Sequence, residues 1–263
     1  ETDCAKDMRL LRVYAAAPTS VPRSPDAQVR SARDAVRAAS EAGIRRQTVQ
    51  LELPPIYRSQ LDDWPGGIRQ QLLVAKPMAT TLIEGLGGTR GATKEKVVDE
   101  GDAVSLLENG PIRTLIFPTA EALVEVRDLA ESASSAEDED SALSLLLNPQ
   151  WSLRGNLVSD FGFGRAKDEA EALVASFEPS FVASEYRIRG ETAFLFRAYP
   201  SDWSLYVIDG ADAEPELAAT FEERPSYKEM EEKLTSRVGS KAAAGLFERL
   251  KNEWAFNRDS LSE

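Results

Sequence analysis

Hydrophobic positions follow a helical period over the first well-patterned stretch of the chain. Residues 25–43 carry apolar side chains every three or four positions, which predicts an amphipathic helix. Ser24 is a suitable N-cap and Gly43 a suitable C-terminal glycine. The run TVQLELP at 48–54 follows and predicts a strand that ends at two prolines. A helix and a strand joined by a short loop are typical of an α/β layer.

Helical and strand-like hydrophobic patterns also alternate through the middle of the chain. They predict a helix that begins in DDWPGG (62–67) and runs to about Leu86, helices over 120–132 and 166–178, and strands over 112–118 and 141–149. Residues 89–110 are mixed and charged and predict a loop with a short helix. The strand–helix–strand spacing of 112–149 predicts a parallel crossover unit.

Alternation with a period of two dominates residues 180–209. In FRAYPSDWSLYVID (196–209), Trp203, Leu205 and Val207 fall on one face of a strand. The turn formers PSD (200–202) separate this strand from the preceding one. Three strand-like runs with tight turns therefore predict an antiparallel meander whose aromatic side chains belong to the core. An edge strand in 216–225 and helices over 226–237 and 240–256 complete the pattern.

These elements predict an α/β fold with a three-layer mixed sheet: a parallel N-terminal part, an antiparallel C-terminal meander and helices on both faces. Three regions are expected, namely 1–23 as a flexible arm or transit-peptide remnant, 24–237 as a single α/β domain and 238–263 as a helical extension. The chain of 263 residues, 42% of them hydrophobic, is long enough to bury a substantial core.

Composition removes several classes of chemistry. The chain contains no histidine, which excludes imidazole bases and histidine-ligated metals, and its single cysteine, Cys4, can form neither an internal disulfide nor a thiolate cluster. Residues 1–46 have a net charge of +3 and the remainder −16, and an acidic body of this kind argues against nucleic-acid binding. RLLRVYAAAPTSVPRSP (9–25) resembles the tail of an organelle transit peptide, with a plain flexible arm as the alternative.

Two glycine motifs are candidates for binding. In SDFGFGRAKDE (159–169), Gly162, Gly164, Arg165 and Lys167 predict an anion site at a helix N-terminus, unless the glycines only supply positive φ angles. No Gly-rich nucleotide loop accompanies the Asp-Phe-Gly tripeptide, so a kinase is not indicated. In WPGGIRQ (64–70), the residues that either contact a partner or pocket or form a tight helix entry are Trp64, Gly66, Gly67, Arg69 and Gln70. No catalytic residue, metal or cofactor is predicted.

Five segments together resemble one family. They are DDWPGGIRQQLLVAKPM (62–78), NGPIRTLIFP (109–118), NPQW (148–151), SDFGFGRAKDEAEALVASFEPS (159–180) and LFRAYPSDWSLYVI (195–208). They are similar to the plastid and cyanobacterial domain of unknown function that includes the low photosystem II accumulation assembly factor, a domain that also occurs beside a chloroplast adenylate kinase. The resemblance covers most of residues 24–237 and carries over no catalytic residue.

The resemblance implies a chloroplast protein of the stroma or the stromal face of the thylakoid. It implies a non-catalytic role in which the protein binds photosynthetic complexes and assists their assembly or stabilisation, as a transient factor or as an accessory or linker subunit of a photosystem or light-harvesting antenna. Tyr199 and Tyr206 are then candidate contacts with protein partners. The alternative is a regulatory α/β domain that binds a nucleotide or a phosphate metabolite, suggested by Gly164 and the kinase-fused relatives.

Overall fold

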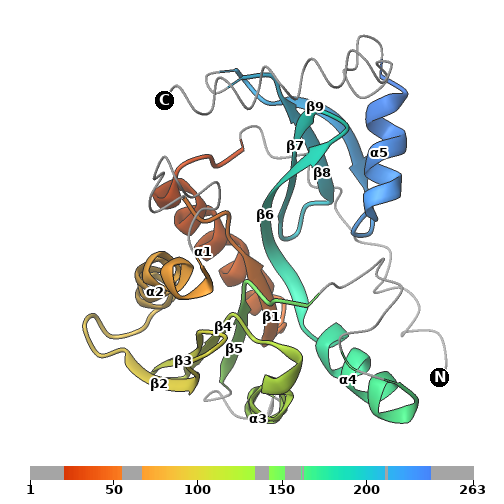
Figure 1. Cartoon of the computed structure of the whole chain (residues 1–263). Coiled ribbons are helices and arrows are strands. Elements are labelled where there is room, and N and C mark those ends of the chain that lie inside the picture. Colours follow the sequence, from red (N-terminus) through yellow and green to blue (C-terminus); the bar gives the residue numbers. More distant parts are fainter. Residues whose placement is uncertain are drawn as a thin grey trace, which may run out of the picture.

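The computed structural model describes residues 21–54, 67–133, 142–151, 161, 163–210 and 213–237, which build one nine-stranded mixed sheet with helices on both faces (Figure 1). The helices are α1 (Pro25–Glu41), α2 (Ile68–Gly85), the 3-10 turn η2 (Ala120–Ala122), α3 (Leu123–Ser132), α4 (Arg165–Ala175) and α5 (Tyr227–Thr235). The strands are β1 (Arg46–Gln50), β2 (Lys94–Asp99), β3 (Val104–Asn109), β4 (Ile112–Ile116), β5 (Leu143–Leu147), β6 (Glu178–Ile188), β7 (Glu191–Ala198), β8 (Trp203–Ile208) and β9 (Glu216–Phe221).

The strand order across the sheet is β2-β3-β4-β5-β1-β6-β7-β8-β9. The four central strands, β4, β5, β1 and β6, are parallel, and antiparallel pairs extend the sheet at both edges. This arrangement confirms the predicted α/β class, the crossover from β4 through α3 to β5 and the C-terminal meander.

Helices α1 and α2 cover one face of the sheet. Their buried side chains, among them Val36, Leu82 and Ile83, join strand residues in the largest core cluster. Phe181 and Phe196 meet edge to face in this cluster, with ring centroids 5.7 Å apart. Such aromatic pairs add directional packing to the area that they bury. The predicted assignment of the meander aromatics to the core is therefore confirmed on this face.

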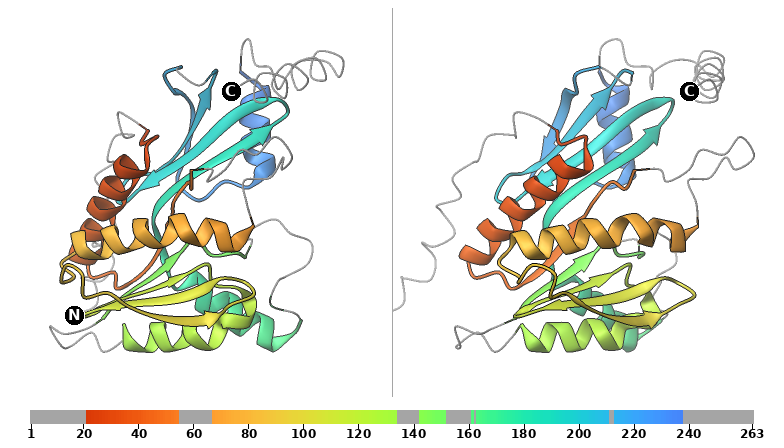
Figure 2. Two further views of the ribbon diagram at one scale, coloured as in Figure 1. Left: turned by 60° about the vertical axis from the view of Figure 1, so that its left-hand side comes forward. Right: turned by 90° about the vertical axis from the view of Figure 1, so that its left-hand side faces the viewer.

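The opposite face is covered by helices at its two ends. Helices α3 and α4 pack on β4 and β5 through Val126, Leu129 and Val174, and Figure 2 shows α2 and α3 on opposite sides of this part of the sheet. Helix α5 packs on the meander, where Met230 and Leu234 contact the group that includes Trp203 and Leu205.

The predicted ends of α1 are confirmed. Ser24 accepts a hydrogen bond from the Ala27 N–H, and Gly43 has a φ of 83°, which a residue without Cβ adopts at little cost. Ser226 and Glu229 form a capping box at the start of α5, with Ser226 Oγ accepting from the Glu229 N–H. Side-chain caps thus fix the starts of two helices whose positions the hydrophobic period gives only approximately.

Two expectations differ from the structure. Residues 89–110, expected as loop plus short helix, form the β2–β3 hairpin instead. β2 is an edge strand whose residues 94–97 are all exposed, so its sequence lacks the apolar alternation that marks a half-buried strand. Helix α2 begins at Ile68 with Gly67 as N-cap, one residue after the segment 62–67 in which its start is expected.

Three further expectations fall on parts of the chain that the structure does not describe. The arm expected over 1–23 is described only from Val21, and the extension expected over 238–263 and its helix lie outside the described residues.

Within the described ranges, no helix is both long and apolar enough to span a bilayer.

The core of α2 offers a direct test of the packing. Leu82 is fully buried and Leu73, on the same helix, is 69% exposed. We expect Leu82→Ala to lower the free energy of unfolding by about 2–5 kcal/mol, since it leaves a cavity between α2 and the sheet. Leu73→Ala, the matched control, should change it by less than about 0.5 kcal/mol. Urea denaturation measures both, and equal losses would contradict the assigned orientation of α2.

Candidate functional site

The carboxyl ends of the parallel strands form the first candidate site. β1 continues to α2 on one face of the sheet, whereas its neighbour β5 continues to α4 on the other. Adjacent parallel strands whose connections leave to opposite faces form a topological switch point, where open α/β sheets usually bind ligands. The described chain reaches Pro54 after β1 and Trp151 after β5, and the WPGG and SDFG motifs follow these residues in the sequence.

Three non-glycine residues with positive φ lie along this same edge. Ala103 has a φ of 57° in the β2–β3 turn, Phe117 a φ of 53° after β4, and Asn148 a φ of 47° after β5. A left-handed conformation is unfavourable for an aromatic residue such as Phe117, and such strained positions concentrate at functional sites. The backbone of this edge is therefore held in a conformation that tertiary contacts must maintain.

The contacts that maintain it come from two amide side chains. Asn148 Oδ1 accepts a hydrogen bond from the Leu51 N–H at 2.7 Å, and Asn148 Nδ2 donates to the Leu51 carbonyl at 2.8 Å. Gln150 Nε2 donates to the carbonyls of Asp102 and Phe117. Asn148 therefore joins the ends of β1 and β5, and Gln150 joins the β2–β3 turn to the end of β4.

A partly buried carboxyl group lies beside this junction. Glu52 Oε2 accepts a hydrogen bond from the Glu185 N–H at 2.9 Å, and the Glu52 N–H donates to the buried Gln28 Oε1. Burial raises the pKa of the Glu52 carboxyl above its ordinary value, and the nearby Glu185 carboxylate raises it further, against the lowering effect of the Glu185 N–H. Glu52 is thus a candidate proton-binding group at the edge.

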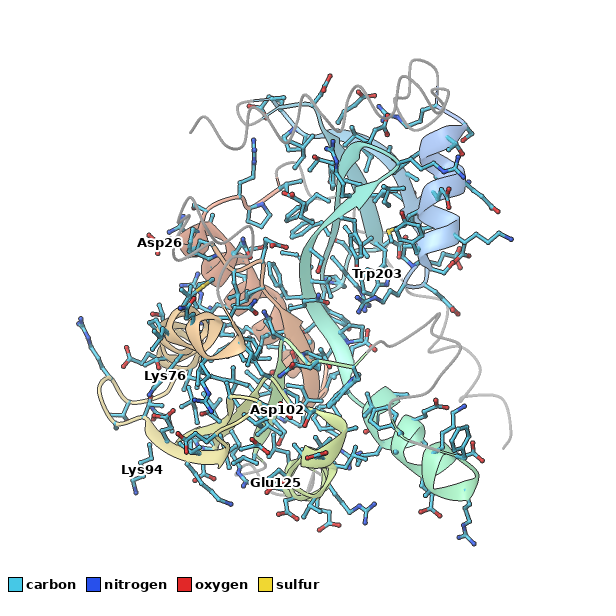
Figure 3. The ribbon with its side chains drawn as sticks, viewed as in Figure 1. Asp26, Lys76, Lys94, Asp102, Glu125 and Trp203 are labelled. Carbon is cyan, nitrogen blue, oxygen red and sulfur yellow. The ribbon has the colours of Figure 1, made fainter. Side chains whose placement is uncertain are left out.

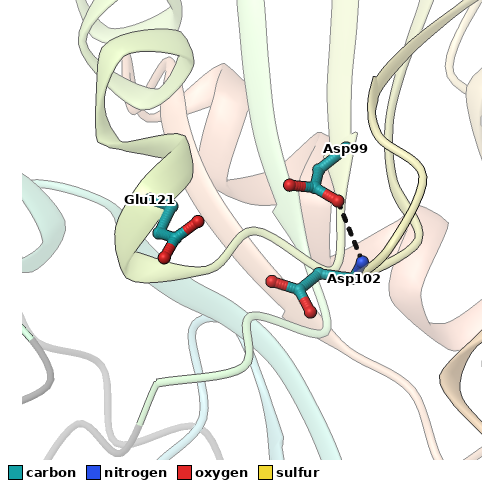
Figure 4. Close-up of side chains that lie close together, drawn as sticks. All are labelled: Asp99, Asp102 and Glu121. Atoms are coloured by element: carbon teal, nitrogen blue, oxygen red, sulfur yellow. Dashed lines mark hydrogen bonds between the residues drawn. The ribbon is translucent and has the colours of Figure 1, made fainter.

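Three carboxylates gather at the outer part of the same edge (Figure 4). Asp99 ends β2, Asp102 lies in the following turn and Glu121 belongs to η2, and one oxygen of each lies within 4.8 Å of the others. Asp99 Oδ1 accepts a hydrogen bond from the Asp102 N–H at 3.0 Å. Oxygen ligands of this kind suit Ca²⁺ or Mg²⁺, with water completing the shell. The sequence shows the Asp99-x-x-Asp102 pair, but the approach of Glu121 depends on the fold.

The structure describes only part of the anion site expected at the start of α4. Gly164 has a φ of 69° as N-cap of α4, and Gly162 lies outside the described residues. Arg165 pairs with Glu169 at 2.8 Å and Lys167 with Glu171 at 3.7 Å, one helical turn further on. These carboxylates lower the positive potential at the helix start, and the anion site stays a prediction.

The structure also describes only some of the residues expected to contact a partner. Arg69 and Gln70 lie exposed on α2 after its N-cap Gly67, while Trp64 and Gly66 lie outside the described residues. Tyr206 is buried in the core with 6% exposure and is not placed to touch a partner. Tyr199 packs against the same core and stays partly exposed, so it remains available for such a contact.

Comparison with known proteins gives one match. A family model described as a domain of unknown function, DUF1995, matches residues 22–232. No curated protein and no solved structure matches the chain. The matched range begins just before α1 and ends within α5, so it contains the whole sheet.

Replacement of Asn148 tests the junction between β1 and β5. We expect Asn148→Gly to lower the free energy of unfolding by about 1–3 kcal/mol, because both hydrogen bonds to Leu51 are lost while the positive φ stays accessible. Asn148→Ala should cost about 1 kcal/mol more, since alanine also resists the left-handed conformation. Urea denaturation of the two variants measures the difference, and an alanine variant as stable as the wild type would contradict this role.

The pKa of Glu52 predicts a pH dependence. Because its folded-state pKa lies above the unfolded-state value, folding favours the protonated acid, and this group makes the protein less stable as pH rises through that interval. We therefore expect the stability of Glu52→Gln, relative to wild type, to be greater at pH 8 than at pH 5. Urea denaturation at both pH values measures it, with the exposed Asp128→Asn on α3 as control for general charge effects. A pH-independent difference would contradict the assignment.

Proposed function

The chain belongs to the DUF1995 family, and from this premise we propose that it is a non-catalytic protein that binds photosynthetic complexes in chloroplasts and assists their assembly or stabilisation. Two observations support the proposal. The segments that resemble the family of the photosystem II assembly factor all lie within the matched range. The exposed side of α2, part of one of these segments, has the composition of a protein contact. The main support for the proposal is the composition of this exposed side of α2.

The exposed side of α2 presents an apolar residue among polar ones. Leu73 is 69% exposed, and Arg69 precedes it by one helical turn and Pro77 follows it by one, both exposed. Residues four apart on a helix lie on the same side, so these three side chains form a continuous surface with Gln70 beside it. A central apolar residue flanked by arginine and amide side chains matches the composition of protein interfaces.

Pro77 adds a backbone group to this surface. Proline has no N–H, so the carbonyl of Leu73 lacks its usual helical donor. This carbonyl lies beside an exposed leucine side chain and can accept a hydrogen bond from a partner. Burial of both together would satisfy the backbone and remove the leucine side chain from water.

The rest of the fold holds this surface in place. The opposite side of α2 contributes the buried Ala75, Met78, Ala79, Leu82 and Ile83 to the core. Lys76 forms an ion pair with Glu95, which connects α2 to the edge strand β2. A rigid helix loses little conformational entropy on binding, so its exposed side chains contribute more of their contact energy to affinity.

Within this proposal the protein acts at the stroma or on the stromal face of the thylakoid, peripheral to the membrane, as an assembly factor or as an accessory or linker subunit. The family resemblance supports this location, and the transit-like composition of the N-terminal region agrees with it. The alternative, a regulatory domain that binds a nucleotide or phosphate metabolite, would use the start of α4 at Gly164.

Affinity capture from mildly solubilised thylakoids tests the proposal. We expect the full chain to retain subunits of one photosystem or antenna complex in a fixed stoichiometry. Leu73→Asp should weaken this retention at least about tenfold, because a buried leucine in the centre of an interface is replaced by a charge. Quantitative mass spectrometry of the captured subunits measures the ratio.

The matched control is Val124→Asp on α3. Val124 is 68% exposed, close to the value for Leu73, and lies on the other face of the sheet. We expect this variant to retain the wild-type partners. Absence of photosynthetic subunits from every capture would contradict the proposed function. Equal retention by Leu73→Asp and the wild type would contradict the role of α2.

A further inference from the structure

A second group of polar side chains lies on the sheet face that α4 and α5 cover at its two ends. Its members come from four parts of the chain: Gln50 ends β1, Arg197 belongs to β7, Trp203 starts β8, and Arg224 lies between β9 and α5. Figure 3 shows Trp203 beside the end of α5, on the side of the sheet that faces this helix. The group lies apart from the exposed side of α2.

The sheet register explains why three of these side chains meet. Gln50 is level with Val182, and Val182 with Arg197. Phe196 pairs with Ser204, so the next position across the β7–β8 ladder brings Arg197 to Trp203. Side chains in one such row point to the same face of a sheet. The chain after β9 then returns over this row and brings Arg224 to it.

The Trp203 ring contacts the guanidinium groups of both Arg197 and Arg224. The guanidinium carbons of Arg197 and Arg224 lie 5.3 Å and 5.4 Å from the centroid of the Trp203 ring, and Trp203 itself is 2% exposed. Cation–π contacts become stronger where water is excluded. The buried ring therefore fixes the two guanidinium groups before any ligand arrives, and a prearranged cation binds an anion at a smaller entropic cost.

The two arginines differ in their other partners. Arg197 Nη2 donates to Glu178 Oε1 at 2.7 Å and Nη1 to the Pro179 carbonyl at 2.8 Å, so its charge and its donors are matched. Arg224 Nη2 donates at 3.3 Å to the neutral Gln50 Oε1, and no carboxylate in the described part of the chain pairs with it. The group thus has a net positive charge at Arg224, although the whole chain has a net charge of −13.

We propose that Arg224 and Gln50 bind the oxyanion group, phosphate or carboxylate, of a small metabolite. A guanidinium group offers parallel N–H donors that match either oxyanion, and Arg224 uses one of them on Gln50. Gln50 Oε1 accepts from Arg224, which leaves the two N–H groups of its Nε2 to donate to the same anion.

The surroundings favour a small ligand. Arg224 and Gln50 are each only partly exposed, which limits access for a large polyanion, and the net negative charge of the chain repels one at long range. Glu52, two residues after Gln50 in the chain, has a carboxylate that accepts a hydrogen bond from the Glu185 N–H. This site differs from the glycine motif at α4 and does not depend on the proposed protein-binding function.

NMR of the indole N–H of Trp203 tests the site, because this ring contacts the Arg224 guanidinium. The probes are inorganic phosphate and succinate, titrated at constant ionic strength, and Trp203→Phe assigns the signal. We expect a saturable shift of this signal in the wild type. Arg224→Gln should weaken binding at least about tenfold, and Gln50→Leu about threefold, as expected for loss of a charged and a neutral hydrogen-bond partner.

Arg127→Gln is the matched control, since Arg127 is an exposed arginine on α3 that belongs to neither candidate anion site. Its binding should equal that of the wild type. A response to phosphate alone or to succinate alone supports the site and identifies its oxyanion, and a response to both supports it as a general oxyanion site. No saturable shift with either probe, or undiminished binding by Arg224→Gln, overturns it. Should Arg224→Gln not fold, undiminished binding by Gln50→Leu overturns it instead.

Discussion

The parallel pairing of β1 with β5 on one side and β6 on the other is the interaction on which the rest of the structure depends. It joins the helix-rich N-terminal half to the C-terminal meander in one sheet. Val49 is fully buried in this strand, and Gln47, equally buried, donates from Nε2 to the carbonyls of Val36 and Ile44. The same strand thus fixes α1 through hydrogen bonds and supports α2 through the shared core.

The position of β1 also determines where the two proposed binding surfaces lie. Its carboxyl end meets that of β5 at the switch point, where Asn148 joins the two strand ends. One face of the sheet carries α1 and α2, and α2 turns Leu73 and Arg69 outward. The other face, at the level of Gln50, brings Arg224 and Trp203 together. Protein binding and anion binding are therefore proposed on opposite faces of one rigid sheet, and each can be tested without the other.

The sequence predicts most of this fold, because the strands with one buried face and the amphipathic helices have clear periods. It predicts neither the β2–β3 hairpin, whose outer strand is exposed on both faces, nor the approach of Glu121 to Asp99. The contact between Arg224 and Gln50 joins residues 174 positions apart and depends on the sheet register. No local pattern encodes such a pair, whereas the composition of α2 is local, and its exposed Arg69 and Gln70 could be selected from the sequence.

The central proposal is that this protein works through contact of the exposed side of α2 with a photosynthetic complex. Cross-linking mass spectrometry on intact chloroplasts tests it most directly, because Lys76 on α2 and Lys94 and Lys96 on the adjacent β2 offer reactive amines. The account predicts cross-links from these lysines to subunits of one photosystem or antenna complex. Cross-links from other surfaces to such a complex, with none from these lysines, or cross-links to soluble enzymes only, would contradict it.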